Sequence, residues 1–115
     1  MPGAVFRPVR FRPTFHKFRG QSLGGAYCHV TDTQAFRPFY AGVAAVHAFY
    51  SLYGERVRSP SGVYEFNNRH PAFDLLTGGP KIREAIVKGI PPRDIESGWK
   101  DVEREFYERR RNYLL

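Results

Sequence analysis

At 115 residues the chain has room for one modest hydrophobic core, which excludes two independently folded domains and predicts a single domain over residues 1–115. An aromatic content of 16% and a charged content of 25% exclude a disordered chain, and a single cysteine excludes an internal disulfide. The net charge of +7 is concentrated toward the N-terminus, because Asp32 is the only acid among the first 50 residues.

Two stretches near the N-terminus have the alternating pattern of strands. In residues 24–32, Ala26, Cys28 and Val30 are expected to form the buried face of a strand, with His29 on the opposite face. Residues 4–11 are also extended, and because prolines cannot donate to a sheet, this segment is expected at an edge. A third, short strand is predicted at residues 63–66.

Helical spacing predicts four helical segments after these strands. They are residues 38–53, a short turn at 70–76 ended by Gly78 and Gly79, residues 80–89 with Ile82, Ala85 and Ile86 facing inward, and a closing helix from Pro92 whose apolar face holds Ile95, Trp99, Val102, Phe106 and Tyr113. We therefore predict an α+β fold. A small, mainly antiparallel sheet of about three strands is packed against about four helices, and the chain ends in a long amphipathic helix.

Arginines alternate with aromatic residues at the start of the chain. The aromatic residues are Phe6, Phe11, Phe15 and Phe18. This pattern occurs in proteins that stack single-stranded bases. It also arises when phenylalanines face a core and arginines form a solvated rim, and we prefer this second interpretation because period-two patterning is the commoner cause.

Catalytic and metal-binding motifs are missing from the sequence. The four histidines lack zinc-ligand spacing, so no metal and no cofactor are expected. Asp74 is expected to bond backbone N–H groups near Thr77 and Gly78. The glycines of residues 77–81 could present N–H groups to an anion. A helix that begins after a tight turn accounts for the same residues, and we prefer this second interpretation. His29, together with Tyr27 and Thr31, forms either a sugar-binding wall or an ordinary solvent face.

The order of several motifs resembles the C-terminal domain of the NamZ-type exo-β-N-acetylmuramidases, which are glycoside hydrolases of peptidoglycan. The stretches that carry the resemblance are "PGAVFRPVRFRPTFHKFRG", "GGAYCHVTD", "AFRPFYAGVAAVHAFYSLY", "FDLLTGGPKIREAI" and "FYERRRNYLL", and they extend from Pro2 to Leu115. The chain departs from the family pattern at Leu23, where a Cys is frequent, and after residue 53, where a Tyr-Pro step is common.

The resemblance implies an auxiliary domain whose partner is an N-terminal Rossmann-like domain. That partner domain carries the catalytic Glu in a Gly-Glu-His-Gly-like motif, which this chain lacks. No catalytic residue is therefore expected in this chain, and a peptidoglycan-derived glycan is the expected ligand. The compartment is the cell envelope or periplasm if the parent protein is exported, and the cytoplasm otherwise. No membrane span and no nucleic-acid partner are expected.

An arginine-rich edge suits a substrate with a lactyl carboxylate, because guanidinium groups hold carboxylates through paired N–H donors. The candidate substrate-binding residues are Arg12, Lys17 and Arg37 for the carboxylate, with Thr14 and His29 for neutral hydrogen bonds. The rival interpretation is that this edge faces the partner domain. Two alternatives remain at this point. The chain could be a stand-alone basic module for nucleic acid or another polyanion, or a purely structural or oligomerising domain.

Overall fold

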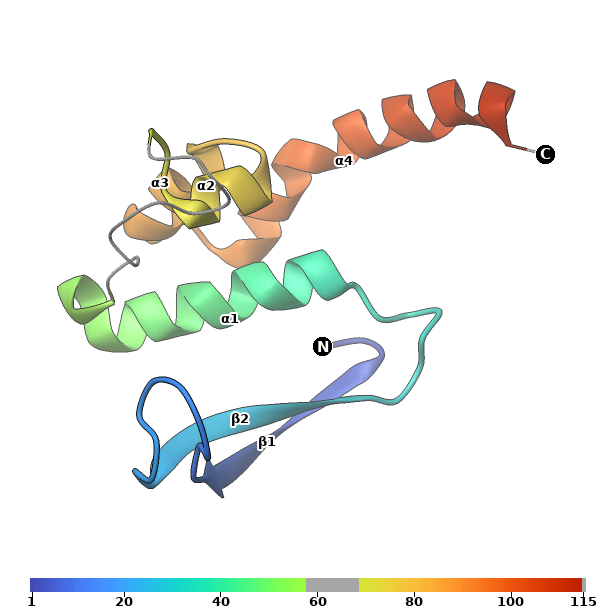
Figure 1. Cartoon of the computed structure of the whole chain (residues 1–115). Coiled ribbons are helices and arrows are strands. Elements are labelled where there is room, and N and C mark those ends of the chain that lie inside the picture. Colours follow the sequence, from blue (N-terminus) through green and yellow to red (C-terminus); the bar gives the residue numbers. More distant parts are fainter. Residues whose placement is uncertain (58–68, 115) are drawn as a thin grey trace. The chain divides into compact units, whose positions relative to one another are not determined.

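The computed structural model of the chain describes residues 1–57 and 69–114 (Figure 1). The elements in these residues are the strands β1 (Ala4–Phe11) and β2 (Leu23–Val30), and the helices α1 (Pro38–Tyr53), α2 (Ala72–Thr77), α3 (Lys81–Val87) and α4 (Pro92–Arg110). The predicted α+β class is confirmed. The predicted strand at residues 63–66 lies outside the described residues. The chain divides into two compact units, Met1–Pro38 and Phe39–Leu115.

The first unit is an antiparallel hairpin of β1 and β2. Its register pairs Val5 with His29, Arg7 with Tyr27 and Phe11 with Leu23. Residues that oppose each other directly point to the same face of an antiparallel pair. In a ribbon of two strands each strand has an unpaired edge, so Pro8 is tolerated in β1, as predicted.

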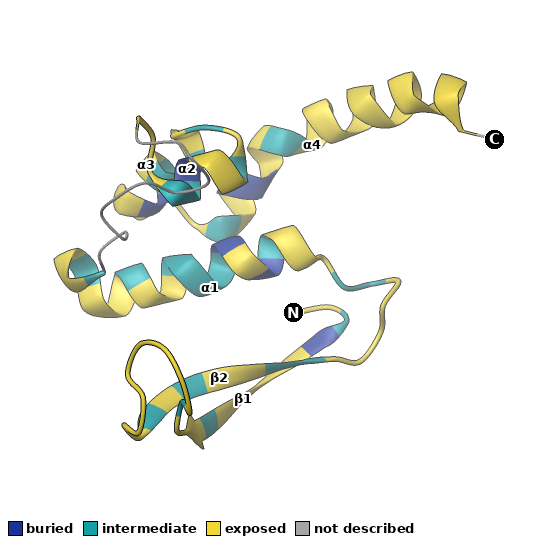
Figure 2. Ribbon diagram, in the orientation of Figure 1, coloured by how far each residue is buried: buried dark blue, intermediate teal, exposed yellow. Residues whose placement is uncertain are grey.

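Most residues of this hairpin are exposed, apart from the buried Ala4 (Figure 2). Ala26 and Val30 are exposed, so the prediction that they form a buried face is wrong. The interpretation of the N-terminal phenylalanines as core residues is also wrong, because Phe6 and Phe11 are 41% and 48% exposed. The physical reason is that two strands alone have too little apolar area to bury either of their faces.

A tight turn closes the N-terminal end of the hairpin around Gly3. The carbonyl of Gly3 accepts hydrogen bonds from the N–H groups of Thr31 and Asp32, at 2.9 and 3.3 Å. Gly3 has a φ of +72°, and a Cβ there would lie 2.5 Å from the carbonyl oxygen of Asp32 and from the amide nitrogen of Phe36. Only glycine fits this position without displacing backbone.

The helical unit has its own small core. Val43 of α1, Ile86 of α3 and Ile95 of α4 are buried together. Partly buried side chains packed against them are Val46, Tyr50, Phe73, Ile82, Ala85 and Trp99. The predicted inward face of α3 is thereby confirmed. Helical spacing brings one apolar stripe of each helix to the same place, which is the usual origin of such a core.

The apolar face of α4 continues well beyond this core. Trp99 packs against the core and contacts the ring of Phe39 edge-on at 5.0 Å. Farther along, Val102, Phe106 and Tyr113 are 64%, 56% and 83% exposed. The prediction of one amphipathic face therefore holds, and the part of this face that packs on the core ends at Trp99.

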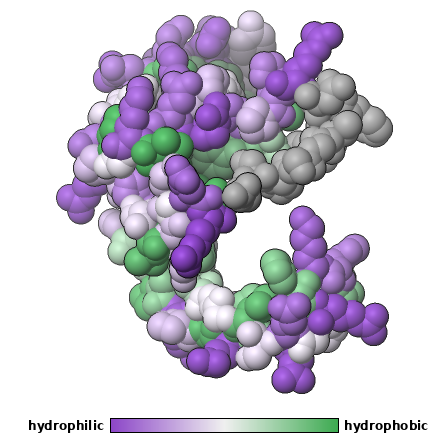
Figure 3. All heavy atoms as spheres, turned by 90° about the vertical axis from the view of Figure 1, so that its left-hand side faces the viewer, coloured by the Kyte–Doolittle hydropathy of each residue, from purple (hydrophilic) through white to green (hydrophobic). Residues whose placement is uncertain are grey.

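Hydrophobic side chains reach the surface between hydrophilic ones in the space-filling view (Figure 3). In the part of the chain that the structure describes, no helix combines the length and the apolar character required to cross a membrane.

Candidate functional site

The loop of residues 12–22 joins β1 to β2 and carries three of the five predicted site residues. Arg12, Thr14 and Lys17 are all exposed on it. Two backbone hydrogen bonds hold the loop, one from the N–H of Gly20 to the carbonyl of Pro13 at 2.9 Å, and one from residue 21 to residue 18 at 3.0 Å. These two hydrogen bonds close a turn within the loop that carries the three side chains.

The backbone of this loop adopts an unusual conformation at two aromatic residues. His16 and Phe18 have φ values of 56° and 59°, in the left-handed region. This region costs a residue with a side chain about 1–2 kcal/mol. Such strain is found preferentially at functional sites. Its structural effect here is a turn in which Phe15 and Phe18 remain 70% and 58% exposed.

The other two predicted site residues lie at the opposite end of the hairpin. His29 pairs with Val5, six residues along β2 from Leu23, which corresponds to roughly 20 Å of strand. Arg37 follows the turn that packs on Gly3, at that same end. Arg12, Thr14 and Lys17 thus share the loop of residues 12–22, whereas His29 and Arg37 lie toward the other end of the hairpin.

His29 is half-buried and stands beside an exposed ring. Tyr27 and His29 have ring centroids 4.6 Å apart. Nε2 of His29 is buried and has no hydrogen-bond partner among the described residues. The ring of Tyr27 is 56% exposed. The structure thus places an exposed tyrosine beside this histidine, and the sugar-binding wall stays a prediction.

A second polar cluster lies in the helical unit, where Arg83 binds Asp74. Nε and Nη2 of Arg83 donate to the two carboxylate oxygens at 2.7 and 2.8 Å. Asp74 is 5% exposed. The hydrogen bond from Arg83 lowers the pKa of Asp74, against the opposing effect of burial, so this carboxyl is a poor proton donor at neutral pH. The prediction that the side chain of Asp74 bonds backbone N–H groups missed this ion pair.

The structure does not support an anion site at residues 77–81. A hollow of about 270 Å³ beside the glycines is lined by His70, Asp74, Leu75, Gly78, Gly79 and Pro80. Pro80, which caps α3, has no N–H to offer an anion. The N–H groups of both glycines bond the carbonyl of Asp74 instead.

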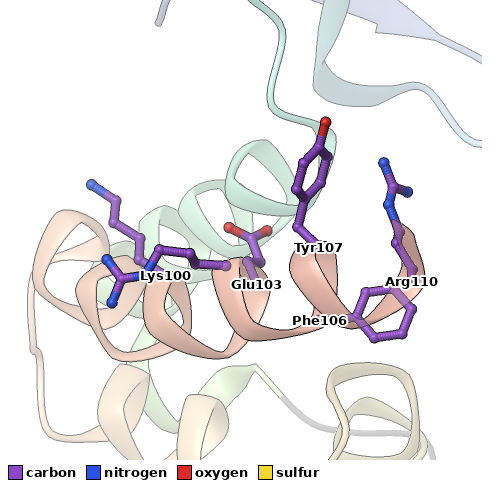
Figure 4. A pocket seen from close by; sticks show the side chains of 6 residues that line it. Lys100, Glu103, Phe106, Tyr107 and Arg110 are labelled. Atoms are coloured by element: carbon purple, nitrogen blue, oxygen red, sulfur yellow. The ribbon is translucent and has the colours of Figure 1, made fainter. Parts of the chain in front are cut away.

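A larger hollow, of about 480 Å³, lies along α4 (Figure 4). It is lined by Lys100, Glu103, Arg104, Phe106, Tyr107 and Arg110, which all belong to that helix. The guanidinium of Arg110 lies over the ring of Tyr107, 4.7 Å from its centroid. These side chains on one side of α4 do not include a paired acid and base or a nucleophile with its base. Within residues 1–57 and 69–114, no group of three or more His, Cys, Asp or Glu side chains could hold a metal ion.

Comparison with known proteins decides the family. The sequence model of the family described as "Exo-beta-N-acetylmuramidase NamZ, C-terminal" matches residues 1–115. The chain belongs to this family. A NamZ relative, the "Peptidoglycan beta-N-acetylmuramidase NamZ" of Bacillus subtilis (strain 168), is 30% identical over 115 residues, which are 100% of this chain and 26% of the relative. The chain thus spans about a quarter of that NamZ protein.

A solved structure supports the fold of this NamZ C-terminal domain. The crystal structure of a DUF1343 family protein from Bacteroides fragilis NCTC 9343 matches 100% of this chain and 29% of its own chain, with a TM-score of 0.77 and 24% identity. At that identity the likeness concerns the fold alone. The chain thus matches 26% of the Bacillus subtilis protein and 29% of the Bacteroides fragilis chain.

Proposed function

We propose that this NamZ C-terminal domain is the auxiliary domain of a peptidoglycan exo-β-N-acetylmuramidase. In this role it helps to wall the substrate cleft beside an N-terminal Rossmann-like catalytic domain, and it has no catalytic group of its own. The observation that carries the proposal is the family match over the whole chain, together with a relative named as a peptidoglycan β-N-acetylmuramidase.

The chemistry of Asp74 is consistent with an auxiliary role. Glycoside hydrolysis needs a carboxyl group with a raised pKa as the general acid, next to a second carboxylate. Asp74 has the opposite property, because Arg83 lowers its pKa. Its ion pair therefore serves the structure of the α2–α3 turn.

The carboxylate-binding candidates now separate into two groups. Arg12 and Lys17 share the loop of residues 12–22, whereas Arg37 lies at the far end of the hairpin and makes an interaction of its own within the chain. One lactyl carboxylate cannot contact both ends. We assign the carboxylate to the loop group, with Thr14 as a hydrogen-bond partner, and place His29 and Arg37 along a more distant part of the cleft wall.

Complementation in trans tests the proposal. The Bacillus subtilis relative is truncated by the quarter that matches this chain, and release of N-acetylmuramic acid from a chromogenic muramoside is measured with and without the 115-residue chain. We expect neither piece alone to be active and the mixture to recover activity. Turnover by the 115-residue chain alone, or full activity of the truncated relative, would falsify the proposal.

A stand-alone polyanion-binding module is the second candidate. It is favoured by the exposure of Phe15 and Phe18 on a loop with cationic neighbours. Binding of single-stranded DNA by this candidate falls steeply with salt, because counterions are released. A titration at two salt concentrations separates it from the first candidate.

A further inference from the structure

The exposed rings of Phe15 and Phe18 have no role in the proposed carboxylate contact. They are 70% and 58% exposed on the loop of residues 12–22. The edge of the His16 ring contacts Phe15, with centroids 5.1 Å apart. Exposed apolar side chains that form a contiguous patch mark interaction sites, and these two rings are only three residues apart on one loop.

The backbone keeps these rings exposed at an energetic cost. Phe18 has a φ of 59°, and the hydrogen bonds from Gly20 to Pro13 and from Gln21 to Phe18 fix the turn around it. A loop with no ligand would gain stability by relaxing this conformation. Retained strain beside exposed aromatic rings points to a ligand that binds on them.

The charges around the rings suit a compact anionic ligand. Arg12, Lys17 and Arg19 are exposed on the same loop. Arg7 and Arg10 of β1, in contrast, point to opposite faces of the hairpin, because side chains alternate along a strand. The basic residues of β1 therefore do not form one continuous track for a long phosphate backbone, whereas Arg12, Lys17 and Arg19 share the loop of residues 12–22 with Phe15 and Phe18.

We infer that Phe15 and Phe18 form a stacking platform for a sugar ring of a carboxylate-bearing glycan, with Lys17 and Arg12 binding the carboxylate of the neighbouring residue. The C–H face of a pyranose ring packs on an aromatic face, while the cations add selectivity for an acidic sugar. This inference rests on the proposed function and adds to it the residues that hold the glycan.

Binding of two disaccharides distinguishes the contribution of ring stacking to the affinity from the contribution of the charged side chains. One is N-acetylglucosamine linked to N-acetylmuramic acid, and the other is made of two N-acetylglucosamine units and lacks the lactyl carboxylate. Binding to the 115-residue chain is measured by NMR titration. We expect Phe15→Ala and Phe18→Ala each to weaken both ligands roughly 2- to 10-fold. Lys17→Ala should weaken only the muramic acid disaccharide.

Phe106→Ala is the matched control, because Phe106 is a similarly exposed phenylalanine on α4 and should leave both affinities unchanged. Amide spectra of each variant verify folding. Wild-type affinities in both loop variants, or no detectable binding of either disaccharide, would overturn the inference. So would loop-dependent binding of single-stranded DNA or anionic vesicles without binding of the disaccharides. Successful complementation in trans would leave the proposed function standing in each of these cases.

Discussion

Arg83 donates two hydrogen bonds, from Nε and Nη2, to the carboxylate of Asp74 across the Gly78-Gly79 turn. This bidentate pair joins α2 to α3. The backbone carbonyl of Asp74 also accepts the N–H groups of Gly78 and Gly79. One residue therefore fixes both the turn and the helix that follows it.

Loss of this pair should destabilise the helical unit. Asp74→Asn keeps the shape of the side chain but removes its charge, so Arg83 loses its charged partner. We expect the free energy of unfolding to fall by about 1–3 kcal/mol, measured by urea denaturation. The partial exposure of Arg83, whose side chain is 38% exposed, keeps the loss below that of a fully buried pair.

Asp101→Asn is the matched control for this experiment. Asp101 pairs with Arg104 at 2.8 Å, but both side chains are largely exposed. Exposed pairs of this kind contribute little, so we expect a change of less than about 0.5 kcal/mol. Equal losses in the two variants would contradict the structural role of Asp74.

The same pair predicts a dependence of stability on pH. Arg83 lowers the pKa of Asp74 in the folded state below its ordinary value of 3.8. A group with a lowered folded-state pKa stabilises the fold above its unfolded-state pKa, and this stabilisation is lost as the pH falls through the folded-state pKa. The stability difference between wild type and Asp74→Asn should therefore be complete at pH 7 and shrink below about pH 4. A difference that grows on acidification would refute the assigned sign.

The sequence predicted the helices well because their ends carry local signals. Pro38 and Pro92 begin helices, Gly54 and Gly78 follow helix ends, and the spacing of apolar residues identified the inward face of α3. Proline and glycine mark helix ends through their own backbone conformations, so these ends can be predicted without knowledge of tertiary contacts.

Burial and long-range geometry could not be read in the same way. Alternation shows that Ala26 and Val30 share a face, but not whether anything covers that face. The separation of His29 from Lys17 follows from strand register, and the contact of Arg83 with Asp74 follows from a turn. The first depends on pairing between residues distant in the sequence and the second on turn geometry, and hydrophobic periodicity records neither.

Gly3 and Gly20 offer a paired test of crowding against backbone strain. They have similar φ values, +72° and +76°. Around Gly20 nothing lies within 4 Å of an added Cβ, whereas at Gly3 the Cβ would meet backbone atoms at 2.5 Å. Gly20→Ala should cost only the left-handed strain of about 1–2 kcal/mol.

Gly3→Ala should cost clearly more than Gly20→Ala, because the closing turn at Asp32 and Phe36 must also move. Thermal unfolding of the two variants, followed by circular dichroism, provides the comparison. Equal melting temperatures would mean that the turn around Gly3 is loose enough to accommodate a methyl group.

The exposed end of α4 gives a final prediction about where the core stops. Trp99 packs on the core of Val43, Ile86 and Ile95, so Trp99→Ala should lower the free energy of unfolding by about 3 kcal/mol. Phe106 lies on the same apolar stripe but is 56% exposed. Phe106→Ala should therefore change the free energy of unfolding by less than about 0.5 kcal/mol. Urea denaturation measures both. If the two losses were alike, the apolar stripe of α4 would be packed along its whole length in the isolated chain, because a buried phenylalanine and a buried tryptophan leave cavities of similar cost.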